Sequence, residues 1–301
     1  MTKIAIIGSG DITQKAYLPI ISRRDVDLHL FARNANAASN IAREYGIKNI
    51  HNTIDSMIDA GVKGAFVHTS TASHFEILKK LLSQGIHVYV DKPVTYDYAS
   101  TKEIFELANA HHARLMVGFN RRYAPAYKNL KQLENVNMIV MQKNRKALPG
   151  DIRTFIFDDF IHVADTLLYL SPHTEHSLTV SGMKRDGLLY HLVIQLKFPD
   201  GFAAIGIMNR DSGTVEEKLE VFTPDGKWQV NNVTDTVILK EKNETKIGTN
   251  DWESTLVKRG FNQIVDEFLS GLESGSSFPG QFPDPLITHR LCEEIVEILS
   301  K

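Results

Sequence analysis

Short apolar runs alternate with longer amphipathic stretches over the first 120 residues of the chain. Apolar runs of this kind predict buried strands, and stretches with apolar positions three and four residues apart predict helices. The predicted strands are Lys3–Gly8, Asp27–Ala32, Lys48–His51 (the weakest), Gly64–His68, Ile86–Val90 and Arg114–Gly118. The predicted helices are Ile12–Arg23, which Pro19 interrupts, Asn34–Tyr45, Ser73–Gln84 and Tyr98–His111. This alternation predicts an α/β domain with a doubly wound parallel sheet at residues 1–120.

The pattern changes after about Tyr123, where strand-length runs are separated by Pro-Asp-Gly turns. Such turns between apolar runs predict antiparallel pairing. The predicted strands are Leu188–Phe198, Ala203–Met208, Lys218–Phe222, Lys227–Val230 and Thr236–Leu239, and the predicted helices are Thr255–Leu272 and Pro285–Leu299. We therefore predict a second, α+β domain at residues 121–301 with a largely antiparallel open sheet. Its last helix, at about 285–300, could pack back on the first domain.

Composition narrows the class of protein. The chain has 34 basic and 36 acidic residues, a balance that argues against a nucleic-acid or anionic-membrane surface. We interpret the pairs Arg23-Arg24 and Arg121-Arg122 and the cluster Lys143–Lys146 as solvated surface. The single cysteine, Cys292, cannot form an internal disulfide. With no signal-peptide pattern and no stretch of membrane-spanning length, we expect a cytoplasmic protein with a small-molecule substrate.

A glycine-rich turn, Gly8-Ser9-Gly10-Asp11-Ile12-Thr13, joins the first strand to the first helix. The first glycine permits a tight turn, and the second lets the backbone approach a pyrophosphate at the helix N-terminus. Thr13 stands where the full dinucleotide-binding Rossmann fingerprint has a third glycine. We predict that Gly8, Ser9, Gly10, Asp11 and Ile12 bind a dinucleotide, the alternative being an ordinary strand-to-helix turn.

The end of the second strand bears on which dinucleotide is bound. An NAD-preferring site usually has an acid there, whereas this chain reads Ala32-Arg33-Asn34. Arg33, beside Asn34, could pair with a 2′-phosphate, so we predict that NADP(H) is preferred and NAD(H) possible. The alternative is that Arg33 is only a solvent-facing residue at a helix start.

Three further groups of polar residues follow predicted strands or lie on a predicted helix. Thr69, Ser70 and His74 could line a cofactor cleft or cap the next helix. Asp91 and Lys92 end the apolar strand Ile86–Val90, at the sheet edge where ligands of parallel sheets bind. Lys92 is therefore a candidate for chemistry.

Asp158, His162 and Asp165 have the i, i+4, i+7 spacing of one helix face. A histidine flanked by carboxylates is suited to general acid/base catalysis, although a polar stripe can also be only the wet face of a helix. The other histidines lack the spacing of metal ligands, so we expect no metal site.

Together these residues resemble the Gfo/Idh/MocA family of nicotinamide-dependent oxidoreductases, and most of all its MviM-type subgroup. The resemblance covers nearly the whole chain, and its motifs include Val90-Asp91-Lys92-Pro93, Gly118-Phe119-Asn120-Arg121-Arg122-Tyr123-Ala124-Pro125 and Asp158-x3-His162-x2-Asp165. It implies an NAD(P)-dependent dehydrogenase or reductase acting on a CH–OH group of a sugar, polyol or cyclitol. It also implies a homodimer or homotetramer formed through the C-terminal sheet.

The resemblance further implies roles for single residues. His162 would be the acid/base, Lys92 would orient the hydroxyl, and Asp158 and Asp165 would hold the imidazole. Cofactor contacts from Asp91, Lys92 and Asn120 are implied as well. The aromatic segment before Asp158 departs from the family pattern and could narrow the substrate pocket. A glycoside hydrolase that uses bound NAD and a non-catalytic dinucleotide-sensing regulator remain the alternatives.

Overall fold

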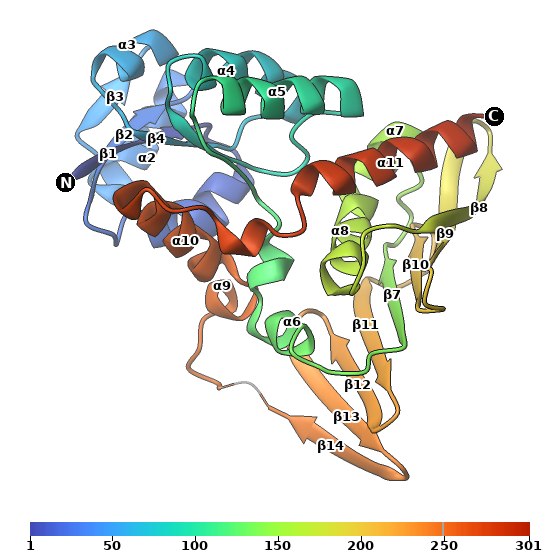
Figure 1. Cartoon of the computed structure of the whole chain (residues 1–301). Coiled ribbons are helices and arrows are strands. Elements are labelled where there is room, and N and C mark those ends of the chain that lie inside the picture. The colour runs from blue at the N-terminus through green and yellow to red at the C-terminus, as the bar shows by residue number, and fades with distance from the viewer. Residues whose placement is uncertain (249) are drawn as a thin grey trace. The chain divides into compact units, whose positions relative to one another are not determined.

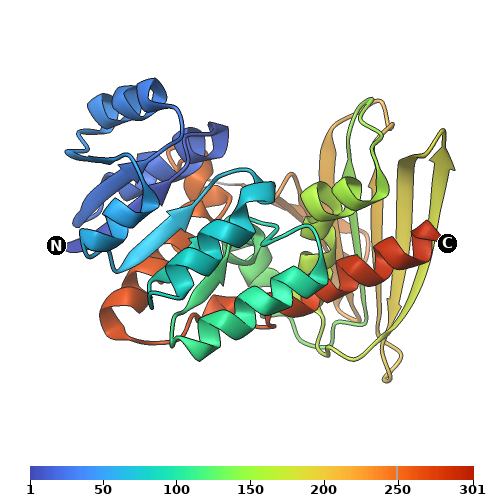
Figure 2. The same ribbon diagram turned by 90° about the horizontal axis from the view of Figure 1, so that it is seen from above.

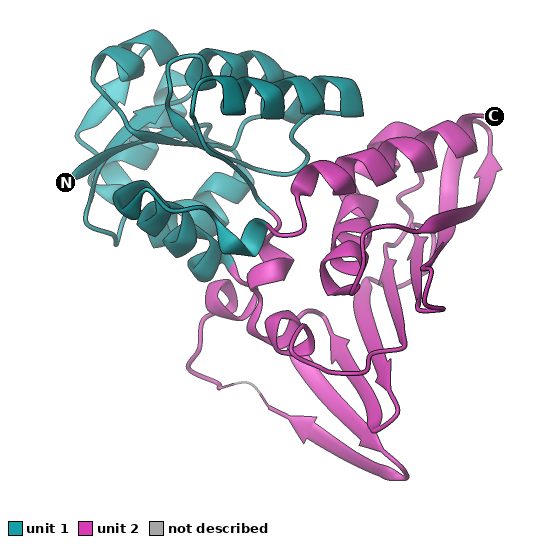
Figure 3. Cartoon of the chain, viewed as in Figure 1, with its two compact units in different colours: residues 1–118, 261–281 teal, residues 119–260, 282–301 magenta. Residues whose placement is uncertain are grey.

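The computed structural model describes residues 1–248 and 250–301 of the chain. The chain forms two units, each built around its own sheet (Figures 1 and 3). Unit 1 consists of residues 1–118 and 261–281, and unit 2 of residues 119–260 and 282–301. None of the helices in the described part of the chain has the length and apolar composition needed to cross a bilayer.

Unit 1 contains the predicted doubly wound sheet, with six parallel strands in the order β3-β2-β1-β4-β5-β6. The strands are β1 (Thr2–Ile7), β2 (Val26–Phe31), β3 (Asn49–His51), β4 (Gly64–Val67), β5 (His87–Val90) and β6 (Leu115–Val117). The helices between them are α2 (Ala35–Tyr45), α3 (Ile54–Asp59), α4 (His74–Leu82), preceded by η2 (Thr71–Ser73), and α5 (Tyr98–Ala110). The strand order reverses between β1 and β4, which is where such sheets bind ligands.

The first helix changes its winding along its length. It is a π-helix at η1 (Thr13–Tyr17) and an α-helix at α1 (Leu18–Ile21), where the sequence predicts one helix over Ile12–Arg23. Pro19 lies at the start of the α-helical part. Proline has no N–H to donate, so it is tolerated in the first turn of a helical segment. The change from π-helix to α-helix just before Pro19 places it in such a first turn.

Helix α10 (Phe261–Ser274), followed by η5 (Pro279–Gln281), belongs to unit 1, although the sequence places this segment in the second domain. Its Phe268 ring lies 4.9 Å from the Phe66 ring of β4, and Asp266 pairs with Arg24. A Cβ at Gly64 would lie 2.5 Å from Leu272, so the glycine admits this helix. An amphipathic pattern shows that a helix covers a core, but it does not say which core.

Unit 2 has an eight-stranded sheet in the order β14-β13-β12-β11-β7-β10-β9-β8, antiparallel except between β7 and β10. The strands are β7 (Met138–Asn144), β8 (Ser177–Arg185), β9 (Leu188–Lys197), β10 (Ala203–Asn209), β11 (Glu216–Thr223), β12 (Gly226–Asn231), β13 (Asp235–Lys240) and β14 (Asn243–Ile247). The largely antiparallel open sheet is confirmed. Strands β7, β8 and β14 were outside the predicted strands, and β7 is central.

Helices cover one face of this sheet (Figures 1 and 2). The unit 2 helices are η3 (Asn120–Tyr123), α6 (Pro125–Leu130), α7 (Ile152–Thr154), η4 (Phe155–Phe160), α8 (Ile161–Leu170), α9 (Thr255–Lys258) and α11 (Pro285–Ser300). A Cβ at Gly206 of β10 would lie 3.0 Å from Leu167 and Val163, so this glycine lets α8 pack closely. Helix α11 packs on α8 and β8, within unit 2.

Candidate active site

An open pocket of about 970 Å³ lies at the carboxyl ends of the unit 1 strands. Eight of the residues predicted to bind the cofactor line it: Gly8, Ser9, Gly10, Ile12, Arg33, Asn34, Thr69 and Ser70. The pocket is also lined by residues that the sequence did not single out, Phe31, Ala32, His68, Ser73 and Ile77. The lining includes two glycines, the hydroxyl residues Ser9, Thr69, Ser70 and Ser73, and one cationic residue, Arg33. Such a surface suits a ligand that brings its own negative charge.

The glycine turn is shaped by the approach of β4. Gly8 has a φ of +119°, and a Cβ on it would lie 2.6 Å from the carbonyl oxygen of His68. At Gly10 a Cβ would come no closer than 4.0 Å to that same oxygen, so the turn stays open there. At Gly8 and Gly10 the backbone is bare and forms a cradle that side chains would fill. Such a cradle fits a dinucleotide pyrophosphate.

His68 gives a second indication that the pocket fits a ligand. Its side chain is 3% exposed, and it stacks on Tyr17 with ring centroids 3.9 Å apart. Within residues 1–248 and 250–301, neither of its ring nitrogens has a hydrogen-bond partner. Burial, and secondarily the charge of His74, lower the pKa of His68 to about 3, so the ring is neutral near pH 7. A buried polar group without a partner is costly unless a ligand or water satisfies it.

The residues after β2 carry no carboxylate. Asn34 caps α2, because its side-chain oxygen accepts a hydrogen bond from the Ala37 amide at 3.1 Å. Arg33 is exposed at the rim of the pocket. Asp11, which was predicted to bind the cofactor, is also exposed and forms an ion pair with Lys15, and the pocket lining does not include it.

His74 lies outside the pocket lining, and its ring contacts two neighbouring loops. Its Nδ1 is 3.0 Å from the carbonyl oxygen of Pro93, and its Nε2 is 3.2 Å from that of Thr69. The ring thus ties the loop after β4 to the loop after β5. Thr69 and Ser70 do line the pocket, and neither caps a helix with its side chain in the described structure.

Asp91 and Lys92 follow β5 and are half-buried. The Lys92 amide donates to Asp91 Oδ1 at 2.9 Å. Burial raises the pKa of Asp91, and the Lys92 ammonium opposes that shift. A Cβ at Gly118 would lie 2.8 Å from the Tyr89 hydroxyl and 3.1 Å from Asp91 Oδ1. Glycine at this position therefore leaves room for the Tyr89 hydroxyl and the Asp91 carboxylate.

In unit 2, His162 lies in the first turn of α8 and is 9% exposed. The preceding segment, η4, is a π-helical turn, so the predicted i, i+4, i+7 face does not continue through it. Asp158 is exposed, whereas Asp165 is buried. The aromatic residues of η4 are core residues rather than pocket walls, since Phe155 and Phe157 are fully buried.

Asp165 has partners other than the predicted one. Its carboxylate accepts from Arg122 at 2.5 Å and from the Thr288 hydroxyl at 3.0 Å. Arg122 also donates to the Pro283 carbonyl oxygen, at 2.7 Å. This buried pair joins η3, α8 and the start of α11, so it positions α8 rather than the imidazole directly.

The interpretation as solvated surface is wrong for the pair Arg121-Arg122 and for Lys143, whereas Lys146 of the same cluster is exposed. Arg121, Arg122 and Lys143 are 6%, 2% and 2% exposed. Arg121 donates to both carboxylate oxygens of Glu217 at 2.6 Å, and Tyr127 donates to one of them at 2.9 Å. Charge can be buried here because each cation has a carboxylate partner from a distant part of the chain. Arg23, by contrast, is exposed as predicted.

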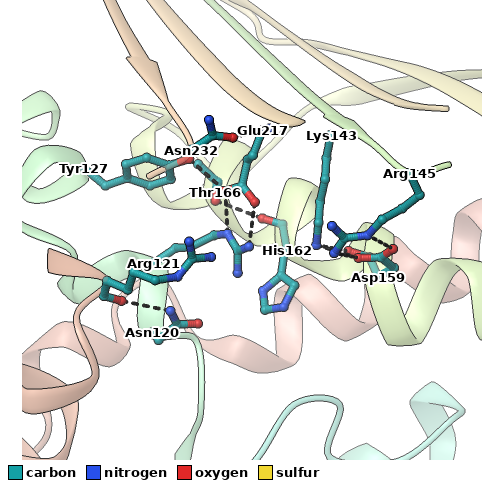
Figure 4. A network of polar contacts seen from close by, with 11 residues as sticks. Asn120, Arg121, Tyr127, Lys143, Arg145, Asp159, His162, Thr166, Glu217 and Asn232 are labelled. Carbon is teal, nitrogen blue, oxygen red and sulfur yellow. Dashed lines mark hydrogen bonds and ion pairs between the residues drawn. The ribbon is translucent and has the colours of Figure 1, made fainter. Parts of the chain in front are cut away.

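Lys143 forms the second half of this network. Its ammonium lies 2.5 Å from Asp159, whose carboxylate also accepts from Arg145 at 3.0 and 3.1 Å. Figure 4 shows His162 between the Arg121 side of the network and the Lys143–Asp159–Arg145 side. Burial, followed by the charge of Arg121, lowers the pKa of Lys143 to about 7. Burial would raise the pKa of Asp159, but Lys143 and Arg145 lower it to about 2.

Asn120, predicted to contact the cofactor, donates from its side chain to the Arg259 carbonyl oxygen at 2.9 Å. The residues of the Lys143 network were absent from the predicted site. The alternation of β7, in which Ile139, Met141 and Lys143 share the buried face, is the signal that could have revealed Lys143. Among the described residues, no group of three or more His, Cys, Asp or Glu side chains could hold a metal ion.

The two sheets, the glycine turn and the switch-point pocket define a Rossmann-fold oxidoreductase with a second α+β domain. A family model described as "Oxidoreductase family, NAD-binding Rossmann fold" matches residues 2–119, and one described as "YceM-like, C-terminal domain" matches residues 125–242. The chain belongs to the Gfo/Idh/MocA family. It is an oxidoreductase of the dehydrogenase and reductase class, as the resemblance implied.

Three similar proteins match 90% or more of the chain. The YceM protein of Salmonella typhimurium is 28% identical over 90% of both chains. A Gfo/Idh/MocA family oxidoreductase from Vibrio cholerae is 30% identical, with a TM-score of 0.93, over 100% of this chain and 98% of the other. The dehydrogenase MviM from Clostridium difficile is also 30% identical, with a TM-score of 0.93 and 99% of each chain covered.

Proposed function

We propose that this protein is an NADP(H)-preferring dehydrogenase or reductase for a sugar, polyol or cyclitol. The reaction would move a hydride between the nicotinamide and a hydroxyl or carbonyl carbon of the substrate. The switch-point pocket carries this proposal, because it joins the bare-backbone cradle at Gly8 to a strand end without a carboxylate. Arg33, at the rim of that pocket, would pair with a 2′-phosphate.

The catalytic roles are proposed for four residues. When bound, the nicotinamide would supply or accept the hydride. His162 would take the hydroxyl proton during oxidation and return it during reduction. Lys92 would donate a hydrogen bond to the same oxygen and stabilise negative charge on it. Asp158 would tune the imidazole, and Asp165, paired with Arg122, would act as a positioning residue through helix α8.

The cofactor preference has a direct test. Reduced-nicotinamide fluorescence titrations should report NADPH binding about tenfold tighter than NADH, the size expected for one charge-assisted phosphate contact. Arg33→Ala should weaken NADPH binding and leave NADH binding unchanged. Arg43→Ala, on an exposed position of α2, is the matched control. Equal affinities for the two cofactors in the unaltered protein would remove the role proposed for Arg33.

A relative with a stated substrate supports the class of substrate. The scyllo-inositol 2-dehydrogenase of Bacillus subtilis is 29% identical over 96 residues, 32% of this chain. A panel of sugars, inositols and small carbonyl compounds, followed by NADP(H) absorbance, tests the class. A substrate that is converted with no net change in the cofactor would favour the hydrolase alternative instead.

We also propose that the protein acts in the cytoplasm as a homodimer or homotetramer formed through the uncovered side of the unit 2 sheet. On that side Val140, Ile205 and Ile207 are half-exposed on neighbouring strands. Light scattering after size-exclusion chromatography should show a smaller species for Ile207→Lys. Val215→Lys, which changes an exposed aliphatic residue outside the strands, should leave the mass unchanged.

A further inference from the structure

The network around His162 has more positive than negative charge. Its carboxylates are Glu217 and Asp159, each already engaged by at least one cation at 2.6 Å or less. Its cationic side chains are Arg121, Lys143, Arg145, Arg210 and Arg259. Two further carboxylates, Asp151 and Asp158, act on Arg210 from exposed positions, where water screens them. Counted without these two screened carboxylates, the network has more cationic than anionic side chains.

Two arginines, Arg210 and Arg259, carry positive charge that no close carboxylate of the described chain fully neutralises. The Arg210 side chain is 12% exposed and lies 4.0 Å from Asp159, while its buried Nε has no hydrogen-bond partner in the described chain. It lies over the Phe155 ring, 5.0 Å from the centroid, which fixes its position. Arg259 is half-buried, and no carboxylate among residues 1–248 and 250–301 lies within ion-pair distance of it. The Arg210 guanidinium is thus held in place, and neither guanidinium is fully compensated by a carboxylate.

Three of these cations meet at one carboxylate, because Lys143, Arg145 and Arg210 lie 2.5, 3.0 and 4.0 Å from Asp159. Arg145 is a charged neighbour of Lys143, Arg210 and Arg259, and Arg121 is a charged neighbour of Lys143 and Arg259. Arg145 itself is about one-third exposed, with a side-chain exposure of 32%. Like charges gathered at the edge of a buried network are unfavourable unless an anion joins them. Figure 4 shows His162, the proposed acid/base residue, between Arg121 and the cations Lys143 and Arg145.

We propose that the substrate carries an anionic group, a carboxylate or a phosphate, which binds to Arg145, Arg210 and Arg259 beside His162. The inference rests on the proposed function, because it assigns a charge to the substrate of the same site. Planar guanidiniums pair with carboxylate and phosphate oxygens in bidentate fashion, so three of them select an anion over a neutral sugar. A neutral polyol would leave the positive surplus uncompensated.

The test compares anionic and neutral ligands of otherwise similar shape by calorimetry on the NADP⁺-saturated protein. D-glucuronate is paired with D-glucose, and myo-inositol 1-phosphate with myo-inositol, so the two pairs separate carboxylate from phosphate. At least one anion should bind about tenfold or more tightly than its neutral partner, as expected for charge-assisted contacts. If neither anion binds more tightly than its partner, or neither binds at all, the inference is overturned.

Variants locate the effect. Arg259→Met should reduce the preference for the anion to near unity, because it removes a guanidinium that forms no ion pair with the described residues and keeps the length of the side chain. Arg210→Met should do the same. Arg290→Met, an exposed arginine of α11, should leave the preference unchanged. An anion preference that survives both of the first two substitutions would place the anion elsewhere.

Proton uptake gives a readout independent of turnover. The charged groups facing Lys143 are Arg121 of η3, Asp159 of η4, Glu217 of β11 and Arg145. A bound anion would raise the pKa of Lys143 from about 7, so binding at pH 8 should take up protons. Calorimetry in buffers of different ionisation enthalpy measures this uptake, and release or no exchange would contradict it. The two proposals can be told apart by the NADPH titration. If NADPH does not bind more tightly than NADH, the proposed function fails. If NADPH binds as expected but no anion is preferred, only the anion site fails.

Discussion

The switch-point pocket of unit 1 and the charged network of unit 2 differ in how their polar groups are supplied. The pocket uses bare backbone at Gly8, small hydroxyls and a neutral imidazole, His68. The network uses paired charges, in which Arg121 meets Glu217 across 96 residues of sequence. The first surface leaves the negative charge to its ligand, and the second has its own charges held by tertiary contacts. The pocket residues come from three short segments, at 8–12, 31–34 and 68–77, each of which lies at or just after the end of a strand of the same sheet.

The largest expected difference between the two regions concerns their histidines. His162→Asn should lower kcat by about 10²–10⁴-fold, the contribution typical of a general acid or base, and should leave NADPH affinity unchanged. His68→Asn should have the opposite signature, with weaker NADPH binding as its main effect. Steady-state kinetics with the substrate found in the panel and NADPH fluorescence titration separate the two. A wild-type kcat in His162→Asn would remove this residue from the mechanism.

The ion pairs Arg122–Asp165 in unit 2 and Arg24–Asp266 in unit 1 should differ in how much they stabilise the fold. Arg122→Met leaves the carboxylate of Asp165 buried without its cation, so the free energy of unfolding should fall by about 3–5 kcal/mol. Arg24→Met breaks a partly exposed pair with Asp266 and should lower it by about 0–1 kcal/mol. Urea denaturation of both variants measures the difference. Similar losses would show that the Arg122 pair gains nothing from burial.

A smaller effect is expected at the glycine turn. Gly8→Ala places a methyl group 2.6 Å from a carbonyl oxygen in a left-handed conformation, which should cost about 1–3 kcal/mol of stability and weaken NADPH binding. Gly248→Ala is the control, because a Cβ there meets nothing within 4 Å. Thermal unfolding and NADPH titration are the measurements. If Gly8→Ala behaved like the control, the cradle would not depend on this close approach.

The smallest expected effect is a change in how the free energy of unfolding depends on pH in the acid range. Burial would raise the pKa of Glu217, but Arg121 lowers it from 4.5 to about 2. The folded state holds its protons less tightly than the unfolded state, so this stabilisation exists above pH 4.5 and is lost as the pH falls toward 2. Glu217→Gln should reduce the slope of unfolding free energy against pH in that window, by up to about 1.4 kcal/mol per pH unit. Denaturant titrations at several pH values would measure the slope, and an unchanged slope would contradict the assignment.

Much of the fold followed from local patterns, and the errors have identifiable causes. The parallel sheet of unit 1 was predictable because its strands β1, β4 and β5 are largely buried on both faces and read as mostly apolar runs. Strand β7 escaped prediction because it ends in Lys143 and Asn144, which look like surface residues until their partners are known. Helix α10 was assigned to the wrong sheet because its apolar stripe fits either core.

The sequence by itself determined the alternation of strands and helices, the glycine turn and the family, because these depend on residues close together in the chain. The tertiary structure decided which charges are buried. Arg121 and Arg122 resemble Arg23 and Arg24 as a sequence pattern, yet Glu217 and Asp165 allow the first pair to lie in the interior. Burial of a charge depends on a partner supplied by another element, and no local pattern specifies that partner.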